Sequence, residues 1–296
     1  MTILDRIVIA ALFAVVAIMI VGAHAPDQGR RPLLPPQARL MPSSPHAAPP
    51  VAPERVRRPP LLAPSATDPL FSVDVQVLKS GAVTLGTAFS VDSGGVWLTA
   101  RHAANASCEQ LVMVVDGRQM PASIAFLHPD ADLAVVRTGR GAPAVPLSAG
   151  PLAIGDTGLS FGYPTGVLGA TEDTLMGRTR MQLGGRLAGI GSTLTWAEGR
   201  RFPDTLETLG GMSGGPMFDE SGRVIGIVVA ASMRRGRVHT VAPEMLADAQ
   251  QETGLFAIGV AETGLSEVAG HDDALPGAAA ALDHASRIAK LYCRVR

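Results

Sequence analysis

The sequence predicts an all-β protein built from two β-barrels, and two observations point to this class. Short runs rich in Val, Leu and Ala, separated by Gly, Pro or Asp, begin near Thr67. Regular short strands with turn signals between them are typical of sandwiches and barrels. The runs also fall into two sets on either side of a Pro-rich turn at 143–151. We therefore expect a first barrel over about 67–148 and a second over about 152–262.

The first set opens on an alternating strand in which Phe71, Val73 and further valines are interleaved with polar residues. Such alternation is typical of a half-buried strand. The runs that follow are "GTAFSVD", "GVWLTA", "LVMVVD", "ASIAFL" and "DLAVVR". The second set contains "TGLSFGY", "RTRMQLGGRLAGI", "STLTWA", "GPMFD", "RVIGIVVAAS" and "RVHTVAP".

Composition narrows the function classes. The 296-residue chain has a formal net charge of −1, so its electrostatics give no argument for a nucleic-acid partner. Its two cysteines, Cys108 and Cys293, have no His or Cys near them at metal-ligand spacing. We therefore expect no zinc site, no other metal and no cofactor.

The N-terminal segment indicates export. Residues 7–23 form an apolar run of 17 residues that follows Arg6 and ends in the small-residue pattern Ala23-His24-Ala25. The pattern fits a signal-peptide cleavage site, and the length is at the lower limit for a membrane-spanning helix. Residues 1–25 are thus predicted to be a signal peptide or an uncleaved signal anchor, which leaves cleavage open. The rest of the chain is expected to be extracytoplasmic, either periplasmic or anchored in the inner membrane and facing the periplasm.

Two further segments flank the predicted barrels. Residues 26–66 hold 12 prolines, six arginines and two acids, a composition that cannot bury a core and predicts a disordered, extended linker. Residues 266–296 form a tail that is too short for a separate domain. Within it, Ala278 to Leu291 can form a short helix.

A serine framed by glycines is the main candidate for chemistry. In "LGGMSGGPMF", residues 209–218, Ser213 occupies either an ordinary turn or a loop that displays a nucleophile. A nucleophilic serine needs a base, and the base needs an orienting partner. His102 directly follows an apolar strand in "VWLTARHA". Asp132 begins the apolar run of "HPDADLAVVR", where an acid is costly unless it is hydrogen-bonded.

The order His102, Asp132, Ser213 is that of the chymotrypsin-type catalytic triad. Asp130 is an alternative orienting residue, and Asp132 is preferred because it adjoins the apolar strand. His128 and His239 are the other histidines of the predicted barrels.

Four blocks of sequence resemble the trypsin-like peptidases of the bacterial HtrA/Deg type. They are "GTAFSVDSGGVWLTARHA", "HPDADLAVVR", "IGDTGLSFGYPTG" and "GGMSGGPMFDESGRVIGIVVA". The resemblance runs from about residue 70 to 245. It implies a chymotrypsin fold of two perpendicular barrels with the site between them, and a protein or peptide substrate.

The resemblance also assigns roles. Ser213 would be the nucleophile, His102 the general base and acid, and Asp132 the orienting residue. The backbone N–H groups of Gly211 and Ser213 would form the oxyanion hole, where glycines leave room for two amides to face one oxygen. The HtrA/Deg proteases usually carry a C-terminal PDZ domain, for which the residues after 265 leave no room. This departure puts peptide-sensing regulation and cage assembly in doubt.

The preference for the substrate's P1 side chain has two alternatives. In trypsin-like enzymes the floor of the S1 pocket lies six residues before the nucleophile, which is Glu207 in this chain. The walls would be the small residues Val229, Ala230 and Ala231. A carboxylate at the floor would favour Arg or Lys at P1. If Glu207 points into solvent instead, the preference would be for small aliphatic P1 residues, as in HtrA-like enzymes.

The sequence thus predicts an exported or membrane-anchored serine endopeptidase that works through an acyl-enzyme intermediate. The alternative is a pseudoprotease, a binding module that keeps the barrels without turnover. A membrane-tethered structural protein would account for the N-terminus but not for the triad. In an exported chain, Cys108 and Cys293 could form one disulfide that pins the tail helix to the first barrel, or remain buried thiols. The natural substrate and the oligomeric state are left open.

Overall fold

The computed structural model of the protein describes residues 58–73, 79–105, 107–148, 150–184, 189–259 and 274–296. The predicted leader at 1–25 and most of the Pro-rich segment lie outside these residues. In the ranges just given, no helix has both the length and the apolar character that crossing a membrane requires.

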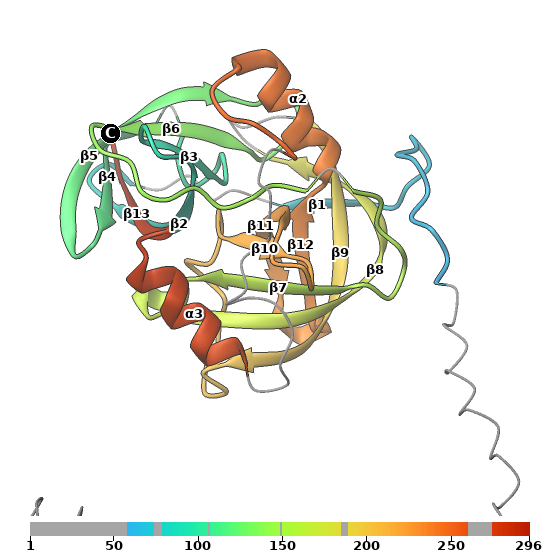
Figure 1. The fold of residues 1–296 in the computed structure, drawn as a ribbon. Coiled ribbons are helices and arrows are strands. Elements are labelled where there is room, and N and C mark those ends of the chain that lie inside the picture. Colours follow the sequence, from blue (N-terminus) through green and yellow to red (C-terminus); the bar gives the residue numbers. More distant parts are fainter. Residues whose placement is uncertain (1–57, 74–78, 106, 149, 185–188, 260–273) are drawn as a thin grey trace, which may run out of the picture. The chain divides into compact units, whose positions relative to one another are not determined.

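The first barrel is a closed sheet of six strands (Figure 1). Its strand order is β13-β2-β3-β6-β5-β4, and all neighbours are antiparallel. The strands are β2 (Val83–Asp92), β3 (Val96–Thr99), β4 (Cys108–Val115), β5 (Arg118–Leu127), β6 (Ala134–Thr138) and β13 (Ile288–Val295). Trp97 on β3 is fully buried, and its indole N–H donates to Thr138 Oγ1 at 2.9 Å.

The second barrel also has six strands, in the order β8-β7-β10-β11-β12-β9, and the pairing of β8 with β9 closes it. They are β7 (Thr157–Gly162), β8 (Gly169–Leu183), β9 (Gly189–Phe202), β10 (Pro216–Phe218), β11 (Val224–Ser232) and β12 (Arg237–Val241). Trp196 on β9 is buried like its counterpart and donates to Thr240 Oγ1 at 2.9 Å. The predicted all-β, two-barrel class is confirmed.

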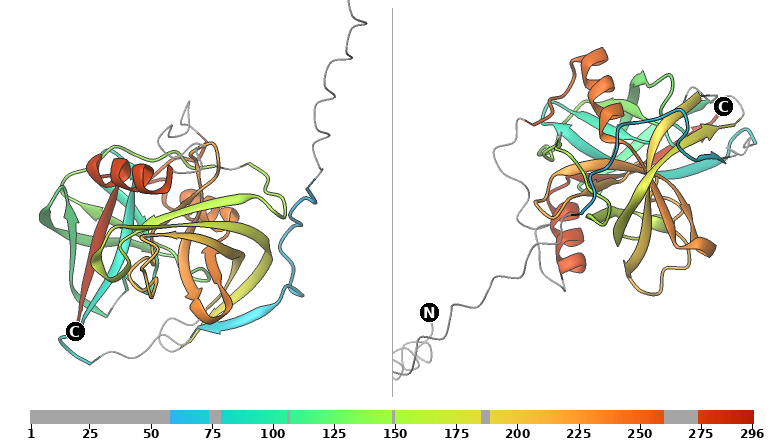
Figure 2. Two further views of the ribbon diagram at one scale, coloured as in Figure 1. Left: turned by 90° about the horizontal axis from the view of Figure 1, so that it is seen from below. Right: turned by 90° about the vertical axis from the view of Figure 1, so that its right-hand side faces the viewer.

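The tail differs from the expected helix over 278–291. A helix, α3 (Ala274–His284), ends before Ser286, whose φ of 57° breaks the helical path. The chain then continues as β13, which lies between β2 and β4 and completes the first barrel; it is the red strand among the blue-green ones in the left view of Figure 2. On β13, Leu291 and Cys293 are buried while Lys290, Tyr292 and Arg294 are more exposed. This period-two burial is that of a strand.

A disulfide between Cys108 of β4 and Cys293 of β13 crosses two neighbouring strands, with an S–S distance of 2.01 Å. Of the two alternatives that the sequence left open, a disulfide or two buried thiols, the structure shows the disulfide. What it pins to the first barrel is the tail strand rather than the tail helix, because the second cysteine lies beyond the end of α3.

The start of the folded part also differs from the expected boundary at residue 67. Leu61 N–H donates to Leu152 O at 2.8 Å, and Ile154 N–H donates to Pro59 O at 2.8 Å. Because proline keeps its carbonyl acceptor and favours extended backbone, the end of a Pro-rich segment can pair in this way. The strand predicted from Phe71 and Val73 is β1 (Leu70–Val73), which pairs in parallel with β8 of the second barrel rather than joining the first.

Candidate active site

A buried carboxylate holds His102 from two sides. Asp132 has a fully buried side chain and precedes β6, while His102 lies in the turn after β3. Asp132 Oδ1 accepts the backbone N–H of His102 at 2.8 Å, and Asp132 Oδ2 lies 2.6 Å from His102 Nδ1. In the neutral imidazole, the bond at Nδ1 places the proton there and leaves the lone pair on Nε2. His102 can therefore accept a proton at Nε2.

The electrostatics of the pair support that role. Burial of the imidazole lowers the pKa of His102, but the charge and the hydrogen bond of Asp132 raise it, and the net shift is upward. The exposed fraction of the His102 side chain is 25%, so a substrate can reach it. Asp130, the alternative orienting residue, is exposed, and it is Asp132 that bonds to His102.

Hydrogen bonds between side chains and the backbone fix the loop that carries Asp132. His128 is buried, and its Nδ1 accepts the N–H of Ala131 at 2.9 Å and of Asp130 at 3.2 Å. Arg101 donates to the carbonyl oxygens of His128 and Pro129, both at 2.9 Å. The other barrel histidine, His239, stacks on Phe71 with ring centroids 4.1 Å apart. Both histidines thus have structural partners.

The Ser213 loop lies against the His102 turn. The carbonyl of Ser213 accepts the N–H of Thr87 on β2 at 2.8 Å. A Cβ at Gly86 would come within 2.8 Å of Ala103 Cβ and 3.2 Å of Ser213 O. Gly86 therefore lies between the His102 turn and the serine loop, where no larger residue fits. A Cβ at Gly214, whose φ is +91°, would lie 2.2 Å from Thr99 Oγ1. Among the residues placed in the structure, no hydrogen bond joins Ser213 Oγ to His102 Nε2; such bonds are often long without substrate.

The backbone N–H groups of the serine loop fall into two sets. The N–H groups of Met212, Gly214 and Gly215 all donate to backbone carbonyls, at 2.7 to 2.9 Å. Within the described part of the chain, the N–H groups of Gly211 and Ser213 make no hydrogen bond. These are the two donors that the family resemblance assigns to an oxyanion hole.

Two carbonyls that precede Ser213 in the same loop accept hydrogen bonds from the first barrel and from the turn after β7. Thr165 N–H donates to Gly210 O at 2.7 Å, and Thr87 Oγ1 donates to Gly211 O at 2.8 Å. Thr87 Oγ1 also accepts the N–H of Tyr163 at 3.0 Å. Sequence reasoning missed Thr87, Tyr163 and Thr165, because "GTAFSVD" and "FGYPTG" carry no local sign of contact with the serine loop.

The residues proposed for S1 lie in two places. Glu207 is exposed in the loop that precedes Ser213. Val229 is buried on β11, Ala230 is half-buried and Ala231 is exposed. Their assignment to a P1 pocket stays a prediction.

The second barrel also buries a pair of carboxyl groups. Asp173 on β8 lies directly opposite Glu198 on β9 and is 1% exposed. Thr171 Oγ1 donates to Asp173 Oδ2 at 2.7 Å, while Asp173 Oδ1 and Glu198 Oε2 have no hydrogen-bond partner among the described residues. Burial, with a smaller contribution from the charge of Glu198, raises the pKa of Asp173 to about 8. Asp173 is therefore a neutral acid over most of the physiological range.

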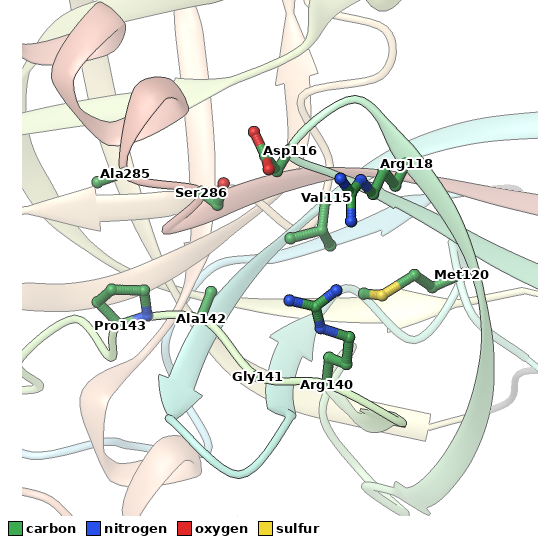
Figure 3. A pocket seen from close by; sticks show the side chains of 10 residues that line it. All are labelled: Val115, Asp116, Arg118, Met120, Arg140, Gly141, Ala142, Pro143, Ala285 and Ser286. Atoms are coloured by element: carbon green, nitrogen blue, oxygen red, sulfur yellow. The ribbon is translucent and has the colours of Figure 1, made fainter.

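A surface pocket of about 210 Å³ lies on the first barrel, and Figure 3 shows the side chains that line it. Arg118 and Arg140 reach into it beside Met120 and Asp116, and Ser286 closes one side. None of its lining residues is a predicted site residue. In the part of the chain that the structure describes, no group of three or more His, Cys, Asp or Glu side chains is arranged to hold a metal ion.

The comparisons with known proteins bear on the class to which these two barrels belong. Residues 86–227 match the family model of the trypsin-like peptidase domain. Its first block, Gly86 onward, opens in the middle of β2, and its last residue, Ile227, lies on β11.

Two curated relatives are similar over half of the chain. HhoA of Synechocystis sp., which is assigned as a serine protease, is 30% identical over 150 residues, or 49% of this chain and 36% of HhoA. The protein y4bJ of Sinorhizobium fredii is 28% identical over 154 residues, or 51% of this chain and 23% of y4bJ. The chain thus spans about a third or less of the length of these relatives.

Solved structures give matches of a similar kind. The active form of the Rv3671c protease from M. tuberculosis is 18% identical, with a TM-score of 0.48, and the match covers 71% of this chain and 98% of that one. The HtrA-type protease AlgW, solved with a decapeptide, is 26% identical, with a TM-score of 0.47, and the match covers 57% of this chain and 51% of that one.

Proposed function

We propose that the protein is a serine endopeptidase in which Ser213, His102 and Asp132 form the catalytic triad. One observation carries the proposal: the only unbonded N–H groups among the loop residues 210–215 are those of Gly211 and Ser213. A turn serine has no need of two free amides beside it, whereas a tetrahedral intermediate requires such donors for its oxyanion.

The geometry suggests how the chain would cleave a peptide bond. Ser213 Oγ attacks the scissile carbonyl carbon, and its proton passes to His102 Nε2. Asp132 keeps the imidazole in the required tautomer through the bond at Nδ1 and stabilises the imidazolium that forms. The carbonyl oxygen becomes an oxyanion and accepts the N–H groups of Gly211 and Ser213.

The intermediate then collapses to an acyl-enzyme. The C–N bond breaks, and His102 gives its proton to the leaving amine. A water molecule, deprotonated by His102, attacks the ester carbonyl; the acyl C–O bond to Ser213 breaks and the serine recovers its proton. No cofactor is needed for either half of the reaction, and the substrates would be proteins or peptides.

We also propose that the domain acts outside the cytoplasm. The apolar run at 7–23 with its Ala23-His24-Ala25 end supports export, and the disulfide between Cys108 and Cys293 fits an oxidising compartment. If the leader is retained, it would hold the domain at the inner membrane, facing the periplasm.

Labelling with a fluorophosphonate probe tests the proposal. The probe should label Ser213 in the full chain, and Ser213→Ala should remove both labelling and peptide hydrolysis while leaving the melting temperature unchanged. Hydrolysis at the wild-type rate by purified Ser213→Ala would refute the triad. A well-folded wild-type protein that binds peptides but is neither labelled nor active would be the pseudoprotease alternative.

A further inference from the structure

The direction of the Gly211 N–H is set by the peptide group to which it belongs. The Gly210–Gly211 peptide is trans, so its C=O and N–H point to opposite sides. The carbonyl of Gly210 is held by the N–H of Thr165 at 2.7 Å. Whatever fixes Thr165 therefore also fixes where the Gly211 N–H points.

Thr165 belongs to a tight turn, η1 (Pro164–Gly166), between β7 and β8. Its φ is 52°, and the turn is closed by Gly166 N–H donating to Tyr163 O at 3.0 Å. A Cβ at Gly211 would lie 2.6 Å from Tyr163 O, so the turn and the serine loop are in direct contact. Because Thr165 has an uncommon left-handed backbone, its conformation depends on support from neighbouring structure.

The C-terminal tail contacts Tyr163, the residue that precedes this turn. Tyr163 is 4% exposed, and its hydroxyl donates to Asp283 Oδ1 of α3 at 2.5 Å. The Lys290 ammonium of β13 lies 5.2 Å from the centre of the same ring. The tail is in turn fixed to the first barrel by the pairing of β13 with β2 and β4 and by the disulfide.

We propose that Asp283 and Tyr163 are positioning residues of the oxyanion hole. The tail holds the Tyr163 ring, the ring holds the turn, and the turn holds the Gly210 carbonyl so that the Gly211 N–H faces the substrate. The inference rests on the proposed peptidase function. On this proposal residues 274–296 help to position the oxyanion hole, although they contribute no residue to the triad.

Removing one hydroxyl tests the proposal. Tyr163→Phe should lower kcat about tenfold with KM within about twofold, because full loss of an oxyanion donor costs about 10²–10³ and a misaligned donor costs less. The Ki of phenylboronic acid, which forms a tetrahedral adduct with the serine, should rise by the same factor. Tyr292→Phe is the matched control, since it removes the hydroxyl of the chain's other tyrosine, also in the tail.

A second pair of variants separates positioning from folding. Asp283→Asn keeps an oxygen that accepts the Tyr163 hydroxyl and should retain kcat, whereas Asp283→Leu should match Tyr163→Phe. Unchanged kcat and Ki in Tyr163→Phe would overturn the proposal. A lower melting temperature of Tyr163→Phe with kcat and Ki unaffected would also overturn the proposal, because the hydrogen bond between Tyr163 and Asp283 would then serve stability alone.

Spectroscopy keeps this test independent of the proposed function. In protein labelled with [15N]glycine, the Gly211 amide resonance should move in Tyr163→Phe and stay in place in Tyr292→Phe. If the wild type hydrolyses nothing and binds no boronate, the peptidase proposal fails, and the Gly211 resonance still decides whether Tyr163 positions that amide. A Gly211 resonance that is identical in all variants would refute the positioning role.

Discussion

The buried acid Asp173 makes stability depend on pH, and the sign can be worked out. Its pKa is about 8 in the folded protein, against an ordinary value of 3.8. Between these two values the folded state keeps a proton that the unfolded state has released. The free energy of unfolding therefore falls as pH rises across this window. The contribution is fully present below pH 3.8 and is lost above about pH 8.

The magnitude follows from the window. A shift of about 4 pKa units at 1.36 kcal/mol per unit gives about 5–6 kcal/mol between its two ends, and a slope of about 1.4 kcal/mol per pH unit within it. Asp173→Asn should remove this slope, because the amide oxygen still accepts from Thr171 while the NH₂ group can donate to Glu198. At pH 8 the variant should be the more stable protein by several kcal/mol, relative to the difference between the two at pH 4.

Urea unfolding followed by circular dichroism at pH 5, 6, 7 and 8 measures this effect. Both proteins should carry Ser213→Ala so that self-digestion does not interfere. Asp248→Asn is the control, since it removes the carboxylate of an exposed aspartate on α2 (Pro243–Thr253). Parallel pH curves for Asp173→Asn and its parent would refute the reasoning, because they would mean that Asp173 ionises alike in the folded and unfolded states.

Three further predictions concern the site and the disulfide. Catalysis needs neutral His102, and the pKa of His102 is raised, so kcat/KM should fall on the acid side with a midpoint above pH 6.5. Asp132→Asn should lower that midpoint and reduce kcat about 10⁴-fold. A pH–rate profile of the variant with an unmoved midpoint would contradict this. Gly211→Ala should reduce kcat about 10²–10³-fold, because the φ of Gly211 is +101° and an added Cβ would lie 2.6 Å from Tyr163 O. Gly210→Ala is the control and should keep kcat in the same assay, because the nearest atom to its Cβ, Thr208 Oγ1, is at an ordinary contact distance of 3.5 Å. Cys108→Ala with Cys293→Ala should lower the free energy of unfolding by about 5 kcal/mol in the chain-entropy model, since the bond spans 185 residues; an unchanged denaturation midpoint would argue against it.

The strands and the candidate triad could be predicted because their signals are local. The apolar run before His102 and the acid at the head of β6 are visible within ten residues of sequence. Each becomes part of the site through strands that pair with near neighbours in the chain, β3 with β2 and β6 with β5. The backbone alternation on these strands then places the side chains.

The tail could not be assigned in the same way. Ala, Lys and Leu at 289–291 favour a helix, and the prediction extended the helix through them. The edges of β2 and β4 override this preference by offering hydrogen bonds to a strand from nearly 200 residues away. The alternation of Leu291, Cys293 and Val295 with polar residues was the available signal. Likewise, Thr87 looks like any strand residue until the second barrel places Gly211 beside it.

Because β13 is the last strand in the sequence, the first barrel can close only late, as the end of the chain emerges from the ribosome or the export channel. The first barrel has five of its six strands by Thr138, yet β2 and β4 remain open edges until Ile288–Val295 appear. At about 5–20 residues per second, the 150 residues in between take roughly 8–30 s. During that wait the open edges could recruit wrong strands, and the turn bearing His102 has no closed barrel to support it. The half of the site that carries His102 would therefore be completed after the second barrel, whose last strand ends at Val241. The proposed peptidase would stay inactive toward its own nascent chain until the tail strand has joined the first barrel.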